Sequence, residues 1–467
     1  MKLKKHLLWL LGFFPCILLS GCGQLNLNVR EMMCPPVLSE EQKGLQEALK
    51  EYVKGHKINM VYPRTGKYTS PFIRPVDMPT TVFVLYSTKE EEKRMVTKMA
   101  MLKRGAEQWA VVSAIDITEG YNISVEEVGI HKLKETGNKN IIVSWQTQGK
   151  KAKEFKIFEC TEELQEVSSS FDFVDKLEAD IDDDGCIEIV FVDRGAGYLP
   201  TLYVLKWDGN NKNPWRVCSV GLKQHKSVLE HSRLILGQIK GGEKVVCIDE
   251  IVYNEDSKSE GLITEVVALH GKNLRNLIWL EDGYDLTDAT FRDKNVAILG
   301  VDGDGFLAVP SEPHVRNPVE TDASTLKLIS WGDIITEDKK PTILMNRLAL
   351  VNLSTPYNFR LPMPWWRTGS TASMNRDVEL NVKCMYSEYE DGNTLTISTL
   401  DKGEKILMIY VVPRGSKAKQ VMDIHLGVFG KYGYFARIYN TDTPVEISEE
   451  ELRELFVPGN NWMNLGR

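Results

Sequence analysis

Four turns of similar length, each followed by an apolar β-rich run, constrain the fold of this chain more than any other feature. The best preserved is Asp180-Ile-Asp-Asp-Asp-Gly-Cys-Ile-Glu-Ile, which continues into Val-Phe-Val. Aligned on their glycines, the other three turns cover residues 132–141, 237–246 and 300–309. The aligned glycines, at positions 137, 185, 242 and 305, lie 48, 57 and 63 residues apart. This spacing fits one four-stranded antiparallel sheet with its loops, repeated along the chain.

The residues between the turns support a β-rich repeat. Runs rich in Val, Ile, Tyr and Trp recur between residues 58 and 345, separated by polar or glycine-bearing turns, which is the pattern of short strands. They lie at 81–86, 110–115, 141–145, 189–193, 201–207, 245–249, 263–269 and 296–299. Residues 89–101 are ambiguous between helix and strand, and residues 76–78 before the first run suggest a fifth, more eroded copy of the turn.

The chemistry of the best-preserved turn predicts a cation site. Carboxylates at alternate positions of a tight loop point their oxygens at one centre, and a glycine at the sixth place allows the sharp turn that brings back the ninth residue. Calcium takes six to eight oxygen ligands. The predicted ligands are the side chains of Asp180, Asp182, Asp184 and Glu188, with the carbonyl of Cys186 as the fifth.

The other turns have lost most of these acids. The turn at 300–309 keeps only Asp302 and Asp304, which form a weaker secondary candidate, and we expect no calcium at 132–141 or 237–246. An EF-hand would need an acid at the twelfth place and flanking helices. The twelfth residue here is Phe191, inside a β run, which excludes that motif.

The Asp-x-Asp-x-Asp-Gly-x-x-Glu-Ile pattern before a β run resembles the FG-GAP/VCBS-type repeats of integrin-like β-propellers. It is also similar to exported bacterial lipoproteins that carry such repeats. The resemblance covers roughly residues 40–345 and is specific at 180–189. It implies a mainly β, propeller-like repeat domain of about five or more blades, in which calcium is a structural cofactor of the loop. Stacking blades buries both faces of each sheet and leaves only short edges.

The N-terminus carries an export signal. A lysine-rich start precedes an apolar stretch from Leu7 to Leu19, and Leu19-Ser20-Gly21-Cys22 ends it. This order is typical of a secretory signal, and its end resembles the lipobox of bacterial lipoproteins. The resemblance implies cleavage of residues 1–21, diacylation of Cys22, and a tether over residues 22–38 on the extracytoplasmic face of the cell membrane. A plain N-terminal membrane helix is the alternative.

Charge narrows the classes of partner. Removing residues 1–21 removes three lysines and no acid, which changes the formal charge from −8 to −11. An acidic exported protein is a poor candidate for binding nucleic acid. Beyond the leader no apolar run approaches 18 residues, so we expect no second membrane span.

Both ends of the mature chain carry helix signals. Ser39 and Gln42 form a capping box before a stripe that includes Leu45 and Leu49, so residues 39–345 are expected to combine one helix with the repeat domain. Residues 346–467 read as a small α+β or antiparallel β domain that ends in a helix at 449–456, capped by Ser448. Its expected strands lie at 378–386, 394–399, 406–412 and 433–439.

Two residue types in the mature chain have a structural interpretation. The cysteines after Cys22 lie mostly in apolar runs without a Cys-x-x-Cys pair, so we expect buried free thiols. The aromatic pair Trp365-Trp366 is expected to pack in a core, with an exposed carbohydrate or partner surface as the alternative.

No catalytic motif stands out. The chain has no His-Glu-x-x-His, no Gly-x-Ser-x-Gly, and no histidine pair at metal-ligand spacing with an acid or cysteine. We therefore expect a non-catalytic surface lipoprotein that binds a protein or glycan partner, or serves as a scaffold. The alternatives are an exported hydrolase whose site lies at the propeller mouth, because that fold hosts many activities, and an envelope assembly factor.

Overall fold

The computed structural model describes most of the chain from Ser39 to Gly459, and the predicted lipidation site Cys22 lies outside that part. Within it, the segments left out are 90–94, 107, 136, 194–199, 208–214, 224–231, 255–258, 271–272, 280–284, 297–299, 302–305, 316–319, 322–324, 338–339, 369–376, 390–391, 416–422 and 440–445. No helix in the described ranges is long and apolar enough to cross a membrane.

Helix α3 (Glu40–Tyr52) opens the fold, and four antiparallel sheets follow it in chain order. Their strand orders are β1-β3-β4-β5 with β2 beside β3, β10-β8-β7-β6 with β9 beside β8, β11-β12-β13-β14, and β15-β16-β17-β18 with β19 beside β17. We number these the first to fourth sheets. The first comprises β1 (Ile58–Met60), β2 (Phe72–Ile73), β3 (Thr81–Lys89), β4 (Met95–Arg104) and β5 (Trp109–Glu119). The second comprises β6 (Ile123–His131), β7 (Asn140–Thr147), β8 (Lys153–Cys160), β9 (Leu164–Glu166) and β10 (Phe171–Phe173).

The third sheet comprises β11 (Asp175–Ala179), β12 (Glu188–Asp193), β13 (Thr201–Trp207) and β14 (Trp215–Gly221). The fourth comprises β15 (Ser232–Gln238), β16 (Lys244–Asn254), β17 (Ser259–His270), β18 (Asn273–Asn276) and β19 (Arg292–Asp293), with a 3-10 turn, η1 (Thr287–Thr290), before β19.

Three further sheets complete the fold. The fifth has the order β20-β21-β24-β25-β26-β34, the sixth β22-β28-β27, and the seventh β23-β29-β30-β31-β33-β32. Bounds in the fifth are β20 (Gly300–Val301), β21 (Leu307–Ser311), β24 (Leu326–Glu337), β25 (Lys340–Asn352), β26 (Tyr357–Arg360) and β34 (Phe456–Pro458). The others are β22 (His314–Val315), β23 (Glu320–Thr321), η2 (Met363–Trp365), β27 (Trp366–Thr368), β28 (Asp377–Leu380), β29 (Val382–Tyr389), β30 (Gly392–Thr399), β31 (Lys405–Pro413), β32 (Ile424–Phe429), β33 (Tyr432–Ile438) and α4 (Glu449–Leu455).

Successive sheets pack face to face, and β12 shows how the sequence achieves this. Ile189 and Phe191 pack with residues of the second sheet, while Val190 and Val192 pack with residues of the fourth. Alternate side chains of a strand point to opposite faces, so the unbroken apolar run supplies two cores at once. The same pairing joins the first sheet to the second, the fourth to the fifth, and the fifth to the sixth and seventh. The predicted mainly β repeat fold with an N-terminal helix is thus confirmed.

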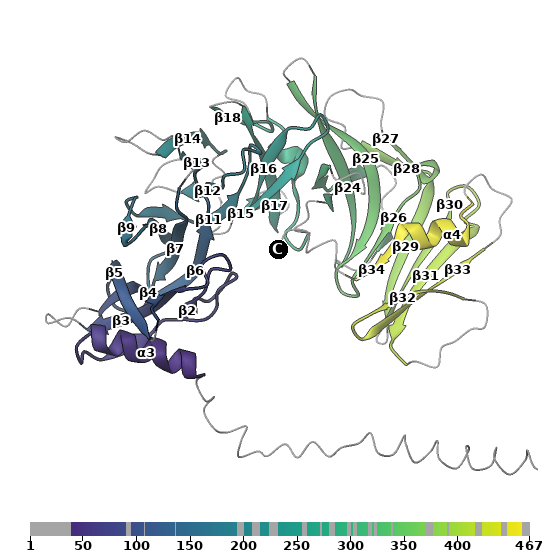
Figure 1. The fold of residues 1–467 in the computed structure, drawn as a ribbon. Helices are drawn as coiled ribbons and strands as arrows, with labels where there is room; N and C mark the ends of the chain where they lie inside the picture. The colour runs from purple at the N-terminus through teal and green to yellow at the C-terminus, as the bar shows by residue number, and fades with distance from the viewer. Residues whose placement is uncertain are drawn as a thin grey trace, which may run out of the picture.

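The stack follows an open arc, and helix α3 covers its first face (Figure 1). Leu45 and Leu49 are fully buried against a cluster that includes Val82, Val84 and Tyr86 of β3. The predicted capping box is present, with the Ser39 hydroxyl accepting from the Gln42 N–H and the Gln42 side chain accepting from the Ser39 N–H. Because α3 occupies the outer face of the first sheet, that face is closed to another sheet.

The repeated turns occupy equivalent places. Each joins the first two strands of its sheet: β6 to β7, β11 to β12, β15 to β16, and β20 to β21. Gly185 and Gly242 have φ angles of 79° and 88°, in the left-handed region that glycine adopts readily. Gly237, near the end of β15, allows the fourth sheet to pack closely on the fifth, because a Cβ there would lie 2.2 Å from Leu307 Cδ1 of the fifth sheet.

The expected boundary at residue 345 falls inside β25. The fifth sheet also contains β26 and β34, so it joins strands from both sides of that position. The reason is that β24 and β25 form a long hairpin, paired from Leu326↔Asn352 to Glu337↔Lys340. A hairpin of this length gives no composition break at its second strand.

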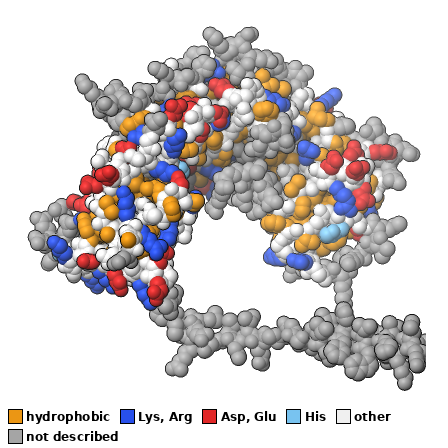
Figure 2. Space-filling model, viewed as in Figure 1, with side chains coloured by type: hydrophobic (Ala, Val, Ile, Leu, Met, Phe, Trp, Pro, Cys, Tyr) orange, Lys and Arg blue, Asp and Glu red, His pale blue; other side chains and the backbone are white. Residues whose placement is uncertain are grey.

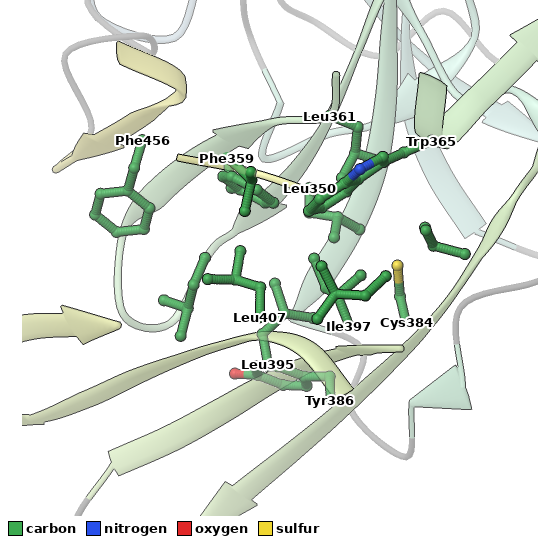
Figure 3. Packing of buried hydrophobic residues seen from close by; sticks show 14 of the residues in the cluster. Leu350, Phe359, Leu361, Trp365, Cys384, Tyr386, Leu395, Ile397, Leu407 and Phe456 are labelled. Carbon is green, nitrogen blue, oxygen red and sulfur yellow. The ribbon is translucent and has the colours of Figure 1, made fainter. Parts of the chain in front are cut away.

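The C-terminal core contains the aromatic pair. Trp365 and Trp366 are buried in a large cluster with Phe359 and Leu350, part of which Figure 3 shows, and Trp366 Nε1 donates to the Leu361 carbonyl at 3.1 Å. The packing interpretation is therefore confirmed over the exposed one. Helix α4 has the predicted capping box of Ser448 and Glu451.

Other differences from the expected elements are local. Residues 95–101 of the ambiguous stretch belong to β4, and the expected strand at 378–386 is split at Asn381 into β28 and β29. Val296 lies outside any strand, and residues 297–299 lie outside the described part. The described cysteines are buried and free, as expected: Cys160, Cys186, Cys218, Cys247 and Cys384.

Candidate functional site

The acidic loop connects β11 to β12 at the margin of the third sheet. Its backbone turns sharply because Asp183 and Gly185 have φ angles of 62° and 79°. Glycine adopts this left-handed region freely, and aspartate is one of the few other residues that tolerate it. The turn brings the start of the loop back to Glu188, the first residue of β12.

Three hydrogen bonds inside the loop orient its carboxylates. Asp180 Oδ2 accepts from the Gly185 N–H at 2.9 Å, and Glu188 Oε2 accepts from the Ile181 N–H at 3.0 Å. Asp184 Oδ1 accepts from the Cys186 N–H at 2.8 Å. Each bond uses one carboxylate oxygen and leaves the second oxygen of that residue to face another partner.

Carboxylate oxygens of three residues of the loop region converge. Asp180, Asp182 and Glu188 each offer one oxygen, and these atoms lie within 4.8 Å of one another. Two oxygens bound to one calcium ion at about 2.4 Å each can lie no more than about 4.8 Å apart, so the three residues are close enough together to share an ion. Asp180 Oδ1 and Glu188 Oε1 are buried, and neither has a hydrogen-bond partner among the described residues. Such atoms suit a ligand that supplies positive charge.

A lysine ammonium lies beside the same carboxylates. Lys206 Nζ is 2.5 Å from Asp182 Oδ2, 2.5 Å from Asp184 Oδ2 and 3.2 Å from Glu188 Oε1. The last contact is an ion pair without hydrogen-bond geometry, which is consistent with Glu188 Oε1 lacking a hydrogen-bond partner. Lys206 belongs to β13, beside β12, so the sheet itself delivers the cation to the loop.

The predicted ligands therefore divide into two groups. Asp180, Asp182 and Glu188 meet, whereas Asp184 contacts Lys206 and the Cys186 N–H and is not one of the convergent set. The carbonyl of Cys186 stays a predicted ligand, and the thiol of the same residue is buried. The weaker candidates Asp302 and Asp304 lie outside the described residues.

Burial and charge shift the acids of the loop in opposite directions. Burial raises the pKa of Glu188, which is fully buried, while the Ile181 N–H and Lys206 oppose that rise. The hydrogen bond from Lys206 lowers the pKa of the more exposed Asp184. Burial thus disfavours the charged form of Glu188, and the nearby Lys206 ammonium favours it.

The neighbouring repeat also contacts this loop. Lys244, which begins β16 of the fourth sheet, pairs with Asp183 and donates to the Asp180 carbonyl at 3.1 Å. On the other side, the Ile187 N–H donates to the carbonyl of Lys132, which follows β6 of the second sheet, at 2.9 Å. The best-preserved turn is thus held between its eroded copies.

A second polar cluster, which the sequence analysis missed, lies between the fourth and fifth sheets. Arg292 is fully buried, and its guanidinium donates to Asp249 Oδ1 at 2.8 Å, Thr264 Oγ1 at 2.9 Å, and the carbonyls of Thr290 and Val296. Asp249 is also buried. Arg292 and Asp249 are 43 positions apart in the sequence, so no local motif predicts that they pair.

A third buried carboxylate, that of Glu265, has neutral hydrogen-bond partners. Glu265 Oε1 accepts from the Lys223 N–H at 2.9 Å, and Glu265 Oε2 accepts from Asn276 Nδ2. Burial raises the pKa of Glu265 to about 7, against the lowering effect of both hydrogen bonds.

Two other places gather chemically useful side chains. His131 Nε2 lies 2.6 Å from Glu178 Oε2, and the buried Lys176 contacts the same carboxylate. Beside α3, a groove of about 1010 Å³ is lined by aromatic and cationic side chains, among them Tyr52, His56, Lys98 and Trp109. Such side chains can stack on a sugar ring or pair with an acidic group.

Comparisons with known proteins give no family. No protein-family profile and no curated protein matches the chain. Among solved structures it is similar to the Dos1 propeller, with a TM-score of 0.24 and 10% identity over 71% of this chain and 72% of that one. It is also similar to a chain from a study of two prolyl endopeptidases, with a TM-score of 0.25 and 9% identity over 80% of this chain and 56% of that one. At these TM-scores neither likeness carries an argument about mechanism.

Proposed function

We propose that this protein is a lipid-anchored, extracytoplasmic binding or scaffold module without catalytic activity, whose third sheet is stabilised by calcium. One observation carries the calcium part of the proposal. Asp180, Asp182 and Glu188 direct oxygens at one point, and two of these residues have a buried oxygen without a hydrogen-bond partner in the described structure.

The bound ion would supply a divalent positive charge between the two ends of the loop. Asp180 and Asp182 would hold it from the turn, and Glu188 would hold it from the first position of β12. Closing the loop in this way ties the turn to the strand that packs against both neighbouring sheets through Ile189 and Val190. An ion that binds only the folded state raises the free energy of unfolding, by about 2.7 kcal/mol at a concentration of 100 times the Kd.

The scaffold part rests on the way the sheets are joined. Successive sheets share apolar clusters, so a surface presented by one sheet is held firmly relative to the next. Acidic and basic side chains are mixed over the face of the arc that Figure 2 shows. A tether ending at Cys22 would hold this surface close to the membrane, where it would meet a protein or glycan partner.

The calcium proposal is tested by thermal unfolding in EDTA and in calcium. We expect calcium to raise the Tm of the natural protein, and the double variant Asp182→Ala/Glu188→Ala to lose that rise. Asp183→Asn is the matched control, because Asp183 lies in the same loop with its side chain 75% exposed and outside the convergent set. An equal calcium response in the double variant would refute the site.

The anchor is tested separately by Cys22→Ala in the exporting cell. The natural protein should incorporate a labelled fatty acid and sediment with membranes, whereas the variant should be unlabelled and released. Membrane retention of a variant that carries no lipid label would show that another segment attaches the protein.

A further inference from the structure

We propose that Lys206 is a built-in competitor of the metal ion, which neutralises the acidic loop when calcium is scarce and leaves when calcium binds. This inference rests on the calcium site proposed above. It concerns how the site is regulated.

The Lys206 ammonium and a bound calcium ion would share ligands. Lys206 Nζ contacts Asp182 and Glu188, two of the three convergent residues, at 2.5 and 3.2 Å. A calcium ion would need oxygens of the same two residues at about 2.3–2.6 Å. Two cations that share these carboxylates would lie within a few ångströms of each other, where their repulsion is strong. Occupation by one therefore excludes the other.

The Lys206 ammonium has an alternative position away from Asp182 and Glu188. Its third partner, Asp184, is outside the convergent set and has a side chain that is 37% exposed. The Lys206 side chain is itself 16% exposed, at the margin of the sheet. The ammonium can therefore withdraw from Asp182 and Glu188 toward solvent while it keeps its contact with Asp184. This arrangement gives Asp184 a role other than that of a calcium ligand.

Competition by Lys206 affects both the calcium affinity of the loop and its folding without metal. An internal cation already compensates the charge of Asp182 and Glu188, so the loop folds without metal. Calcium must displace that cation, and the displacement weakens its binding. The site is thereby suited to the high calcium concentrations outside a cell, where weak oxygen-ligand sites are filled.

The test compares Lys206→Met with Lys244→Met, each as the full mature chain. Both changes remove one lysine that contacts the loop, but Lys244 reaches Asp183 and a carbonyl and does not contact the convergent carboxylates. Calcium affinity is measured by titration calorimetry, and the Tm is measured in EDTA and in calcium. Lys206→Gln serves as a second variant in case the methionine protein folds poorly.

We expect Lys206→Met to bind calcium about tenfold more tightly than the natural protein, while Lys244→Met changes the affinity by less than about threefold. In EDTA the Tm of Lys206→Met should fall, and saturating calcium should restore it. Unchanged or weaker calcium binding by Lys206→Met would overturn the competition alone. An absence of calcium binding by both the natural protein and Lys206→Met would overturn the calcium site, and the competition with it.

Discussion

The acidic loop of the third sheet and the Asp249–Arg292 cluster of the fourth sheet both pair carboxylates with a cation, but the two cations differ. Each contains a buried carboxylate, Glu188 in the loop and Asp249 in the cluster, and each places a cationic side chain beside it. In the fourth sheet the cation is a fully buried guanidinium with four described hydrogen bonds. In the loop it is the Lys206 ammonium at the margin of the sheet, which contacts the carboxylates of Asp182, Asp184 and Glu188.

The chemistry of the cation determines which cluster can change state. The guanidinium has a fixed planar fork, is always charged, and is bound to two carbonyls and a threonine hydroxyl as well as to Asp249, so it cannot leave without stranding several groups. The ammonium is a compact charge on a flexible stem. Its removal exposes only carboxylates, which another cation can satisfy. The first cluster is therefore structural, and the second is suited to exchange.

The largest expected effect comes from removing the fixed cation. Arg292→Met leaves the Asp249 carboxylate buried without its countercharge, and we expect a loss of about 3–5 kcal/mol in the free energy of unfolding. Denaturant unfolding measures this loss. The control is the double variant Asp249→Asn/Arg292→Met, which removes both charges and should lose clearly less. If both proteins lose the same amount, lost packing around the arginine explains the effect and the charge does not.

The next effect concerns a buried carboxylate with no cation directly bonded to it. The pKa of Glu265 is raised from 4.5 to about 7 in the folded protein, so the folded state holds this proton more tightly than the unfolded state. Its contribution to stability is greatest at low pH and is lost as the pH rises from about 4.5 to about 7. The total is at most about 3 kcal/mol.

Glu265→Gln should remove this part of the pH slope. The glutamine has a cost of its own, because its amide N–H₂ must face either the Lys223 N–H or Asn276 Nδ2, both of which are donors in the structure. That cost is constant with pH. The slope of the unfolding free energy between pH 4.5 and 7.5 is therefore the readout. A variant with the same slope as the natural protein would show that Glu265 does not titrate in this range.

The smallest effect is the response to salt. At 1 M ionic strength the Debye length is about 3 Å, so contacts at a sheet margin are screened and deeply buried ones are screened much less. In EDTA, the destabilisation caused by Lys206→Met should shrink by less than about 1 kcal/mol between 0.05 and 1 M NaCl. The destabilisation caused by Arg292→Met should stay the same. An equal salt response of both variants would remove the proposed distinction between an exchangeable and a fixed cation.

The sequence predicted features that depend on neighbouring residues. Both capping boxes were predictable because Ser39 and Gln42, and likewise Ser448 and Glu451, are three residues apart and bond to each other's backbone. The repeated turns were also predictable, since each carries its own glycine and leads into an apolar strand.

The sequence did not reveal pairings made by the tertiary fold. Lys206 contacts Asp184, 22 residues away, and Arg292 contacts Asp249, 43 residues away. The residues around Lys206 and Arg292 in the sequence give no sign of these pairings. For the same reason the loop was expected to have four equivalent acidic ligands. Asp184 lies outside the convergent set, and its two oxygens are taken up by the Cys186 N–H and by Lys206.

Helix α3 closes one end of a column of sheets, and this has a consequence for how the protein unfolds and evolves. Apolar clusters link each sheet to the next in the row, which is the condition for nearest-neighbour cooperativity. Such a column can gain or lose an internal layer and still bury both faces of the layers that remain. Loss of the terminal helix is more costly. Without α3, the apolar outer face of the first sheet, which includes Val82 and Val84, would be exposed to water and would favour aggregation with other chains.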